Sequence, residues 1–441
     1  MDNKSELFEK IRQQFDSAPY PRTPLEDTPK DSPNSLYIHN LVTAYYVRNQ
    51  KVIDTKDKLI LDAGCGTGYK ALALAIANPG AKIVGIDFSE EAVKLAEQRL
   101  QYHGIDNAEF HVMSIEDLPS LGMEFDYINN DEVLYLITDP VAGLQAMKAV
   151  LKPDGIIRSN VHSTIQRVNF FRAQELFTIM GVMDESDPEL ASEMVRETMA
   201  ALKNQVVLKK NAWGKKIEES TETILANILL RGDKGFTIPE LFSIFRAVDL
   251  EFINMVNWRQ WDLMDLFEDP DNLPVFLGMS LPEASVEEQL HIYELLNPLH
   301  RLLDFWCGHP NQGQSFVPPA EWEKSDWETA RVHLHPQLKT PEMKEELVRC
   351  ITQLNAFEIS RFLPPVSGFV AVDSNIAACL LPLLDAPLSM KAMVERLQVV
   401  KPLNTVTMEP TTAEEALDLL INALTGLERF GYVLLERVVC S

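Results

Sequence analysis

The chain has 441 residues, of which 46% are hydrophobic, so it can bury a large core and should hold two or three units of ordinary domain size. Its 65 acidic and 40 basic residues give a net charge of −25, which disfavours nucleic acid as a partner because phosphate binding draws mainly on clustered Lys and Arg. No apolar signal region follows the first residues and no stretch reaches the length of a membrane span, so we expect a cytoplasmic protein without a membrane partner.

The first fifty residues precede the first predicted strand. They begin with an amphipathic helix over 7–15, continue through a proline-rich stretch, and end in a helix over 35–46. Tyr20, Tyr37 and His39 are the side chains of this segment that we predict to reach a ligand. Packing in the core is the alternative, since aromatic residues at helical spacing are more often core.

A glycine-rich turn then lies between two apolar strands. Residues 59–68 read Leu-Ile-Leu-Asp-Ala-Gly-Cys-Gly-Thr-Gly, and a second strand over 82–86 ends in Asp87. Glycines at such a turn let the backbone approach a ligand closely, and a carboxylate at the tip of the next strand can accept both hydroxyls of a ribose. This pattern predicts a nucleoside-binding βαβ unit.

The spacing of the motif indicates which nucleoside is bound. The order Gly64-x-Gly66-x-Gly68 differs from the Gly-x-Gly-x-x-Gly fingerprint of dinucleotide sites, and the preceding Asp62 suits an ammonium better than a pyrophosphate. Together with Asp87, the motif resembles that of class I S-adenosylmethionine (SAM) dependent methyltransferases. The resemblance implies a seven-stranded Rossmann-like α/β core, SAM as cofactor and S-adenosylhomocysteine (SAH) as product. An unrelated glycine turn or a dehydrogenase is the alternative.

The third and fourth predicted strands, over 108–112 and 125–129, add further residues to this site. The resemblance implies adenine contacts just after the third strand, where Ser114 stands at a position that is Asp in many relatives. The cofactor-binding residues implied are Asp62, Ala63, Gly64, Cys65, Gly66, Gly68, Asp87, Phe88, Ser114, Ile115, Glu116 and Asn130.

The loop after the fourth strand supplies the predicted catalytic residues, because ligands of open parallel sheets bind outside the carboxyl ends of the strands. Methyl transfer from a sulfonium is an in-line displacement that requires neither a nucleophilic side chain nor a metal, and a base is needed only when the acceptor must lose a proton. We predict Asp131, Glu132, His39 and Tyr135 as catalytic residues and Tyr20, Tyr37, Tyr135 and His162 as substrate contacts. Helix capping by the two acids, and an ordinary strand-end role for His162, are the alternatives.

The second half of the core is interrupted. A helix over 141–151 and a strand over 156–160 follow, but the next helix and strand, over 236–248 and 250–256, come some seventy residues late. Residues 166–232 therefore read as a helical insertion. A second helical stretch, over 285–306, precedes a predicted seventh strand at 330–335. Such inserts would wall in a substrate pocket and offer a face for a homodimer.

The last hundred residues predict a separate α-rich domain in which three helices precede a short strand, an order that suits a winged-helix-like fold. Its candidate recognition helix, 414–427, is acidic, which favours a packing or protein-contact role over DNA binding. The predicted divisions are 1–50 (lid and helical segment), 51–165 (SAM-binding core), 166–232 (insertion), 233–336 (remainder of the core with a second insertion) and 340–441 (C-terminal domain).

The cysteines and histidines give weak signals. Five cysteines lie apart without Cys-x-x-Cys spacing, which indicates neither a disulfide framework nor a zinc site. His309, His333 and His335 are candidates for a metal site, but a polar strand face explains the last two equally simply. We expect no metal.

The leading hypothesis is a SAM-dependent methyltransferase acting on an O or N atom of a small molecule or peptide. A protein (lysine) methyltransferase is the first alternative, since an acidic surface would suit a cationic substrate. The second is a SAM-binding regulatory or scaffold protein without turnover, suggested by the absence of a histidine pair near Leu134 and Tyr135.

Overall fold

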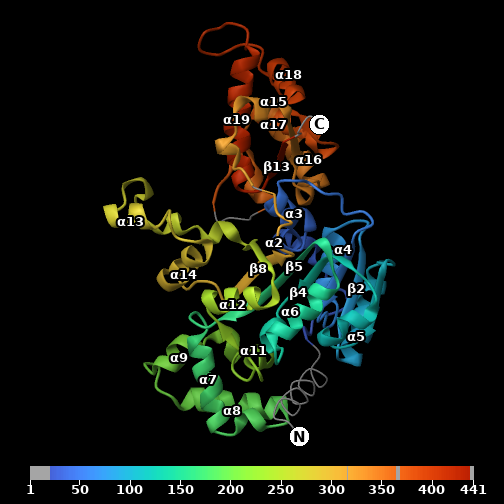
Figure 1. Cartoon of the computed structure of the whole chain (residues 1–441), viewed down its shortest axis with the longest axis vertical. Helices are drawn as coiled ribbons and strands as arrows, with labels where there is room; N and C mark the ends of the chain where they lie inside the picture. The colour runs from blue at the N-terminus through green and yellow to red at the C-terminus, as the bar shows by residue number, and fades with distance from the viewer. Residues whose placement is uncertain (1–19, 315, 364–367, 438–441) are drawn as a thin grey trace.

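The computed structural model describes residues 20–314, 316–363 and 368–437 (Figure 1). The helix predicted over Leu7–Phe15, and Cys440, lie outside these residues. Figure 1 shows a central α/β core, the helical insertion at one end of it and the C-terminal domain at the other.

The core is built on one twisted sheet with strand order β3-β2-β1-β4-β5-β8-β7, and the two-residue β6 pairs with β5 beside this path. Strands β1 to β6 pair in parallel, whereas β8 runs antiparallel to both β5 and β7. The strands are β1 Leu59–Ala63, β2 Lys82–Asp87, β3 Ala108–Val112, β4 Phe125–Asn130, β5 Leu151–Ser163, β6 Gly235–Phe236, β7 Glu251–Met255 and β8 Leu302–Gly308. The predicted α/β class with a Rossmann-like parallel core is confirmed.

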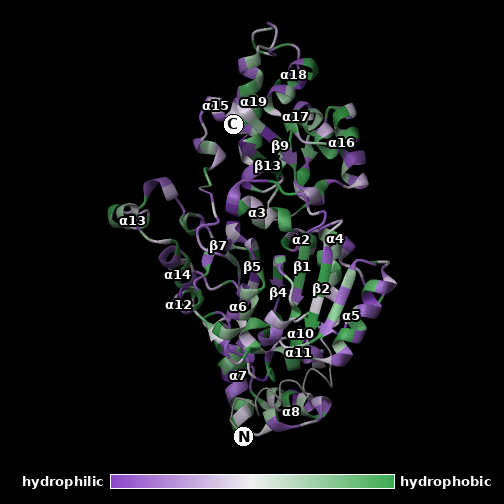
Figure 2. Cartoon of the chain, turned by 45° about the vertical axis from the view of Figure 1, so that its right-hand side comes forward, coloured by the Kyte–Doolittle hydropathy of each residue, from purple (hydrophilic) through white to green (hydrophobic). Residues whose placement is uncertain are grey.

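Alternating side chains of these strands pack on the two faces of the sheet, as the period of two requires. Ile60 and Leu61, neighbours in β1, belong to different hydrophobic clusters, and so do Phe305 and Trp306 in β8. One cluster includes residues of helices α6 (Pro140–Ala149), α12 (Ile238–Val248) and α14 (Val286–Leu296), and the other includes residues of α3 (Leu41–Asn49), α4 (Tyr69–Ala77) and α5 (Glu90–Tyr102). Hydrophobic residues are accordingly concentrated in the inner strands (Figure 2).

Two predictions of strands and helices are corrected by the pairing. The strand at 330–335 is not the seventh strand of the core, because β9 (Ala330–Leu334) pairs instead with β12 (Leu388–Ser389) and β13 (Val433–Arg437) of the C-terminal domain. Its place is taken by β8, at the end of the stretch over 285–306 that reads as helical. Most residues of β8 are buried, including Phe305, Trp306 and Cys307 in succession, so a regular alternation of the kind that marks a half-buried strand is absent from this part of its sequence. The residues between the predicted helix over 141–151 and the predicted strand over 156–160 lie within β5, where the pairing with β4 shifts register.

The helical insertion has its own hydrophobic cluster, which includes Phe177, Val195 and Ile224. It consists of α7 Val168–Ile179, α8 Pro188–Ala201, α9 Val207–Ala212, α10 Lys215–Glu218 and α11 Thr221–Asn227. The short helix α13 (Val275–Ser280) projects from the segment between β7 and β8 (Figure 1).

The C-terminal domain has a cluster of its own that begins at Trp322, earlier in the chain than the predicted start at residue 340, and it also takes in Tyr37 from α2 (Pro33–Ile38). Its sheet has the order β12-β9-β13, with a separate pair β10-β11. The predicted order of three helices and a strand is present as α17, α18, α19 and β13. The elements are α15 Lys324–Thr329, α16 Pro341–Gln353, α17 Ser374–Leu380, α18 Met390–Val400, α19 Ala413–Arg429, β10 Phe357–Glu358, β11 Ala371–Val372, β12 Leu388–Ser389 and β13 Val433–Arg437.

None of the helices in the described ranges combines the length and apolar character needed to cross a bilayer. The four cysteines among the described residues are free thiols and are buried.

Candidate active site

The glycine turn between β1 and α4 has the backbone that its sequence predicts. Gly64, Gly66 and Gly68 all have positive φ, at 85°, 49° and 82°, which favours glycine over any residue with a Cβ atom. The turn is tied to the next strand, because the Gly66 amide donates to Asp87 Oδ2 at 3.0 Å and the Ser89 amide donates to Oδ1 at 2.9 Å. The two halves of the predicted motif therefore form one unit.

A cavity of about 330 Å³, here called the cofactor cavity, lies over the carboxyl ends of these strands. Predicted cofactor residues that line it are Gly64, Cys65, Gly66, Asp87, Phe88, Ser114, Ile115 and Glu116. Apolar side chains such as Ile86 and Met113 join them. The structure brings together residues from the turns after β1, β2 and β3, as expected of a nucleoside site in an open parallel sheet.

A strap formed by residues 20–25 crosses the glycine turn. The Thr67 amide donates to the carbonyl of Tyr20, and the Thr67 hydroxyl donates to that of Pro21 at 2.8 Å. The buried guanidinium of Arg99 donates to the carbonyls of Thr23 and Thr67. These bonds hold Tyr20, Pro21 and Thr23 against the cofactor cavity, which all three line.

Four predicted cofactor residues lie beneath the cavity and do not line it. They are Asp62, Ala63, Gly68 and Asn130. Asn130 is occupied within the fold, since its side-chain amide donates to the Ala63 carbonyl and its oxygen accepts from Ser159. Asp62 Oδ1 accepts from Asn129, but Oδ2 has no hydrogen-bond partner among the described residues, and burial raises the pKa of this carboxyl to about 7.

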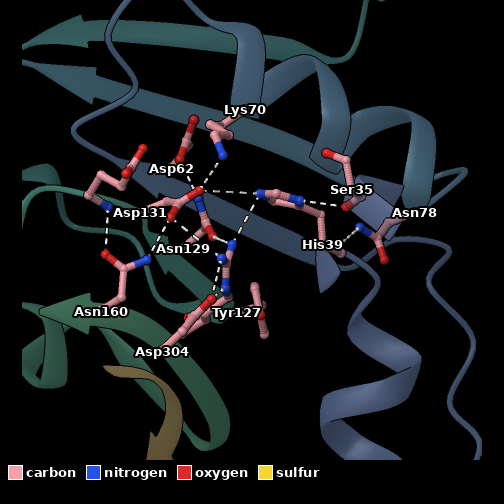
Figure 3. A network of polar contacts seen from close by, with 12 residues as sticks. Ser35, His39, Asp62, Lys70, Asn78, Tyr127, Asn129, Asp131, Asn160 and Asp304 are labelled. Carbon is pink, nitrogen blue, oxygen red and sulfur yellow. Dashed lines mark hydrogen bonds and ion pairs between the residues drawn. The ribbon is translucent and has the colours of Figure 1, made fainter. Parts of the chain in front are cut away.

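A buried polar network lies behind the cavity, centred on Arg158 of β5. Figure 3 shows Asp131, Asn160 and Asp304 of this network. Its guanidinium donates to Asp304 of β8 at 2.8 and 3.1 Å and to Asp131 at 3.4 Å. Asp131 also pairs with Lys70 at 2.6 Å and accepts from Asn160 at 2.6 Å (Figure 3). Lys70 and Asp131 line the cofactor cavity, so the network reaches the site at this point.

This network decides the charge of two predicted catalytic residues. Burial alone would raise the pKa of Asp131, but Arg158 and Lys70 outweigh it and hold that pKa well below its usual range. Burial lowers the pKa of His39 to about 4, and its ring lies between Arg158 Nη1 and the Ser35 carbonyl. The structure does not bring His39 to the cavity, and Asp131 is a poorly basic carboxylate.

A second cavity of about 570 Å³, here called the acceptor cavity, adjoins the first. Tyr20, Glu132 and Leu136 line both cavities. The helical insertion closes its other side, through residues of α10 and α11 that include Lys216 and Glu222. This arrangement agrees with the expectation that the insertion walls in a pocket.

Glu132 occupies the junction in a constrained conformation. Its φ is 63°, its amide donates to Asn160 Oδ1 at 2.8 Å, and its carboxylate pairs with Arg301. Left-handed backbone at a non-glycine residue is uncommon and persists where its surroundings enforce it. Tyr20 faces the same junction, and partial burial of its phenol together with Glu132 raises the pKa of that group to about 12.

Tyr135 also lines the acceptor cavity, with its ring stacked on that of His162 at 3.7 Å between centroids. His162 lies beneath it and lines neither cavity; its Nδ1 contacts Asp233 at 2.6 Å and its Nε2 contacts Arg301 at 3.1 Å. Tyr37 lies elsewhere, in the C-terminal domain's cluster, where its hydroxyl accepts from Arg259. The structure therefore unites Tyr20 and Tyr135 and leaves Tyr37 apart.

Several site residues are missing from the sequence-based prediction. Lys70 follows the glycine turn by two residues, and that position was its only signal. Arg301, Asp233 and the cavity residues of the insertion lie far along the chain and carry no local motif. The histidines considered for a metal are engaged separately: His309 contacts the Leu151 carbonyl, His333 contacts Glu436, and His335 contacts Thr43. Within the described ranges, no group of three or more His, Cys, Asp or Glu side chains is placed to hold a metal ion.

Comparison with known proteins agrees with this geometry. Residues 54–226 match the family model of a methyltransferase domain. An uncharacterised protein of Synechococcus sp. is 26% identical over 317 residues, which cover 71% of this chain and 73% of that protein. The ubiquinone biosynthesis O-methyltransferase of Actinobacillus pleuropneumoniae is 32% identical over 144 residues, which are 32% of this chain and 58% of that enzyme.

Among solved structures, PKMT2 from Rickettsia typhi, also solved in complex with AdoHcy, shares the fold with a TM-score of 0.57 at 15% identity. The match covers 91% of this chain and 75% of that one. The fold, the glycine turn joined to Asp87 and the family match together confirm the predicted family, enzyme class and cofactor. Residues 54–226 of this chain are a class I SAM-dependent methyltransferase domain.

Proposed function

We propose that the chain transfers the methyl group of SAM to an oxygen or nitrogen atom of a small molecule or peptide held in the acceptor cavity. The observation that carries the proposal is the junction at which Tyr20, Glu132 and Leu136 line both cavities. In-line displacement needs the acceptor atom, the methyl carbon and the sulfur aligned across such a junction, with water excluded. The relative that is a ubiquinone biosynthesis O-methyltransferase supports oxygen as one of the two acceptor atoms.

The residues of the cofactor cavity fit SAM. Asp87 would accept from the ribose hydroxyls, the apolar side chains of Met113 and Ile115 would contact the adenine, and the turn at Gly64 and Gly66 would lie against the cofactor. When bound, SAM supplies a methyl group activated by a sulfonium. The chain's own contribution is to hold the two reactants, to exclude water through the strap, and to manage the acceptor's proton.

Glu132 is the residue that we propose to orient the acceptor and to take its proton. It is the one carboxylate among the described residues that line both cavities. Asp131 is less suited because it is buried between two cations, Lys70 and Arg158, which hold it as a weakly basic anion, whereas the more accessible Glu132 pairs with Arg301 alone. Tyr20, with its raised pKa, stays protonated near neutrality and can donate to an acceptor oxygen.

The test is methyl transfer from tritiated SAM to a panel of phenols, carboxylic acids, primary amines and a lysine-containing peptide. We expect label in at least one class, and a loss of about 10²-fold or more in kcat for Glu132→Gln, as for removal of a general base. Affinity for SAH should fall far less than kcat in this variant, although Glu132 also lines the cofactor cavity. Glu222→Gln is the matched control, since Glu222 lines only the acceptor cavity.

Transfer to the peptide alone would favour the protein methyltransferase alternative. Binding of SAH without transfer to any acceptor would contradict the proposal and favour a regulatory or scaffold protein. A cytoplasmic location, a homodimer formed through the insertions and the absence of a nucleic-acid partner stay predictions.

A further inference from the structure

The acceptor cavity has a local charge opposite to that of the whole chain. Three cations, Arg22, Lys216 and Arg301, line it together with two carboxylates, Glu132 and Glu222. The balance is one positive charge in a protein whose net charge is −25. A surface of average composition would have made this cavity negative, so the local composition itself indicates the charge of the ligand.

The two carboxylates of this cavity are already engaged within the fold. Glu132 pairs with Arg301, and Glu222 Oε1 accepts from the backbone amide of Arg22 at 3.3 Å. By contrast, the Arg22 guanidinium and the Lys216 ammonium make no ion pair with any residue of the described ranges. Both side chains are exposed, so their charge is available to a ligand that enters the cavity.

The third cation is fixed in place from below. Arg301 Nη1 donates to His162 Nε2 at 3.1 Å, and His162 Nδ1 donates to Asp233 at 2.6 Å. Asp233 is completely buried and also accepts from Arg167 and Gln174 of the insertion. The guanidinium of Arg301 therefore meets the cavity from a rigid support, which lowers the entropy lost when it binds an anion.

We propose that the acceptor carries an anionic group, a carboxylate or a phosphate, that Arg22, Lys216 and Arg301 bind while its nucleophilic atom faces the junction at Glu132. This inference rests on the proposed function and narrows its substrate class. A cationic acceptor, such as the ammonium of a lysine side chain, would meet a lining with one net positive charge, in which Arg22 and Lys216 make no ion pair with any described residue. The geometry thus favours an acidic small molecule.

The experiment is calorimetric titration of the SAH-saturated protein with benzoate, benzamide, benzylamine and phenyl phosphate, which differ in charge around the same ring. We expect one or both anions to bind at least tenfold more tightly than benzamide, and benzylamine not to bind. The Arg22→Gln/Lys216→Gln double variant should lose at least tenfold in affinity for the anion. Lys215→Gln is the matched control, because Lys215 pairs with Glu219 and does not line the cavity.

Benzoate against phenyl phosphate decides between a carboxylate and a phosphate. Equal or tighter binding of benzylamine, absence of binding by both anions, or anion binding that the double variant leaves unchanged would each overturn the inference. Titration with SAH in the same series separates the two proposals. A protein that binds SAH but no anion contradicts only the anionic acceptor, whereas a protein that does not bind SAH contradicts the proposed function itself.

Discussion

Replacement of Asp62 by Asn should stabilise the protein above neutral pH and leave it nearly unchanged in acid. Asp62 is buried beneath the glycine turn, where Oδ1 accepts from Asn129 and Oδ2 has no hydrogen-bond partner among the described residues. Burial raises the pKa of this carboxyl from 3.8 to about 7. An asparagine keeps the oxygen that accepts from Asn129 but never ionises.

The sign and size follow from proton linkage. Between the two pKa values the folded chain holds a proton that the unfolded chain has released, so the free energy of unfolding falls as pH rises from about 4 to about 7. The pKa of Asp62 differs by about three between the unfolded and folded chain, and each pKa unit corresponds to 1.36 kcal/mol, so the loss of unfolding free energy is at most about 4 kcal/mol. At pH 8 the Asp62→Asn variant should therefore be more stable than the wild type by up to about 4 kcal/mol.

The assay is urea unfolding followed by tryptophan fluorescence at pH 5, 6, 7 and 8. The difference between variant and wild type should grow with pH, which isolates this one carboxyl from all others that titrate. Asp106→Asn, at an exposed position, is the control for the loss of one carboxyl group. An unchanging difference for Asp62→Asn, or a variant less stable at pH 8, would refute the reasoning.

Two further substitutions test the site's construction. A Cβ atom at Gly66 would lie 2.3 Å from the Tyr20 carbonyl oxygen at a φ of 49°, so Gly66→Ala should lower stability by about 1–3 kcal/mol and weaken SAH binding in calorimetry. Gly104→Ala is the control, because Gly104 has a φ of 69° but open space around it, so this variant should show the backbone strain without weaker SAH binding. Equal SAH binding by both variants would contradict the contact between the strap and Gly66. Asp131→Asn leaves Arg158 with one fewer buried counter-charge and should cost about 3–5 kcal/mol in urea unfolding; a change below about 1 kcal/mol would contradict the network.

The sequence predicted the parallel half of the core because its information is local. Strand, glycine turn and terminal acid lie within thirty residues around Gly64 and Asp87, and eight of the predicted cofactor residues line one cavity. The antiparallel strand β8, which joins β5 to β7, could not be predicted from such local patterns. The alternating pattern at 330–335 does indicate a strand, but which sheet it joins depends on packing of the C-terminal domain. The strand that completes the core sheet beside β5 is β8, a mostly buried strand that contains Asp304. The reason for an acid at this buried position is its ion pair with Arg158 on β5, which local sequence does not reveal.

The side chains around the acceptor cavity could be predicted even less well from local sequence patterns. Glu132 was predicted from its place after β4, but its partner Arg301 lies 169 residues further on. His39 is predicted to reach the ligand from the segment before the first strand, yet its burial against Arg158 removes it from the cavities. The positions of these side chains relative to the cavities depend on tertiary contacts, which residue type alone does not predict.

Calorimetric titration with SAM, SAH and NAD tests the central claim most directly. We expect micromolar binding of both adenosyl ligands, no binding of NAD, and an affinity for SAH about 10–100-fold weaker in Asp87→Asn, since hydrogen bonds to a charged group contribute about 1.5–3 kcal/mol. Asp117→Asn, exposed and outside the cavity, should bind SAH as the wild type does. Binding of NAD in place of SAM, or SAH binding that Asp87→Asn leaves unchanged, would contradict the account.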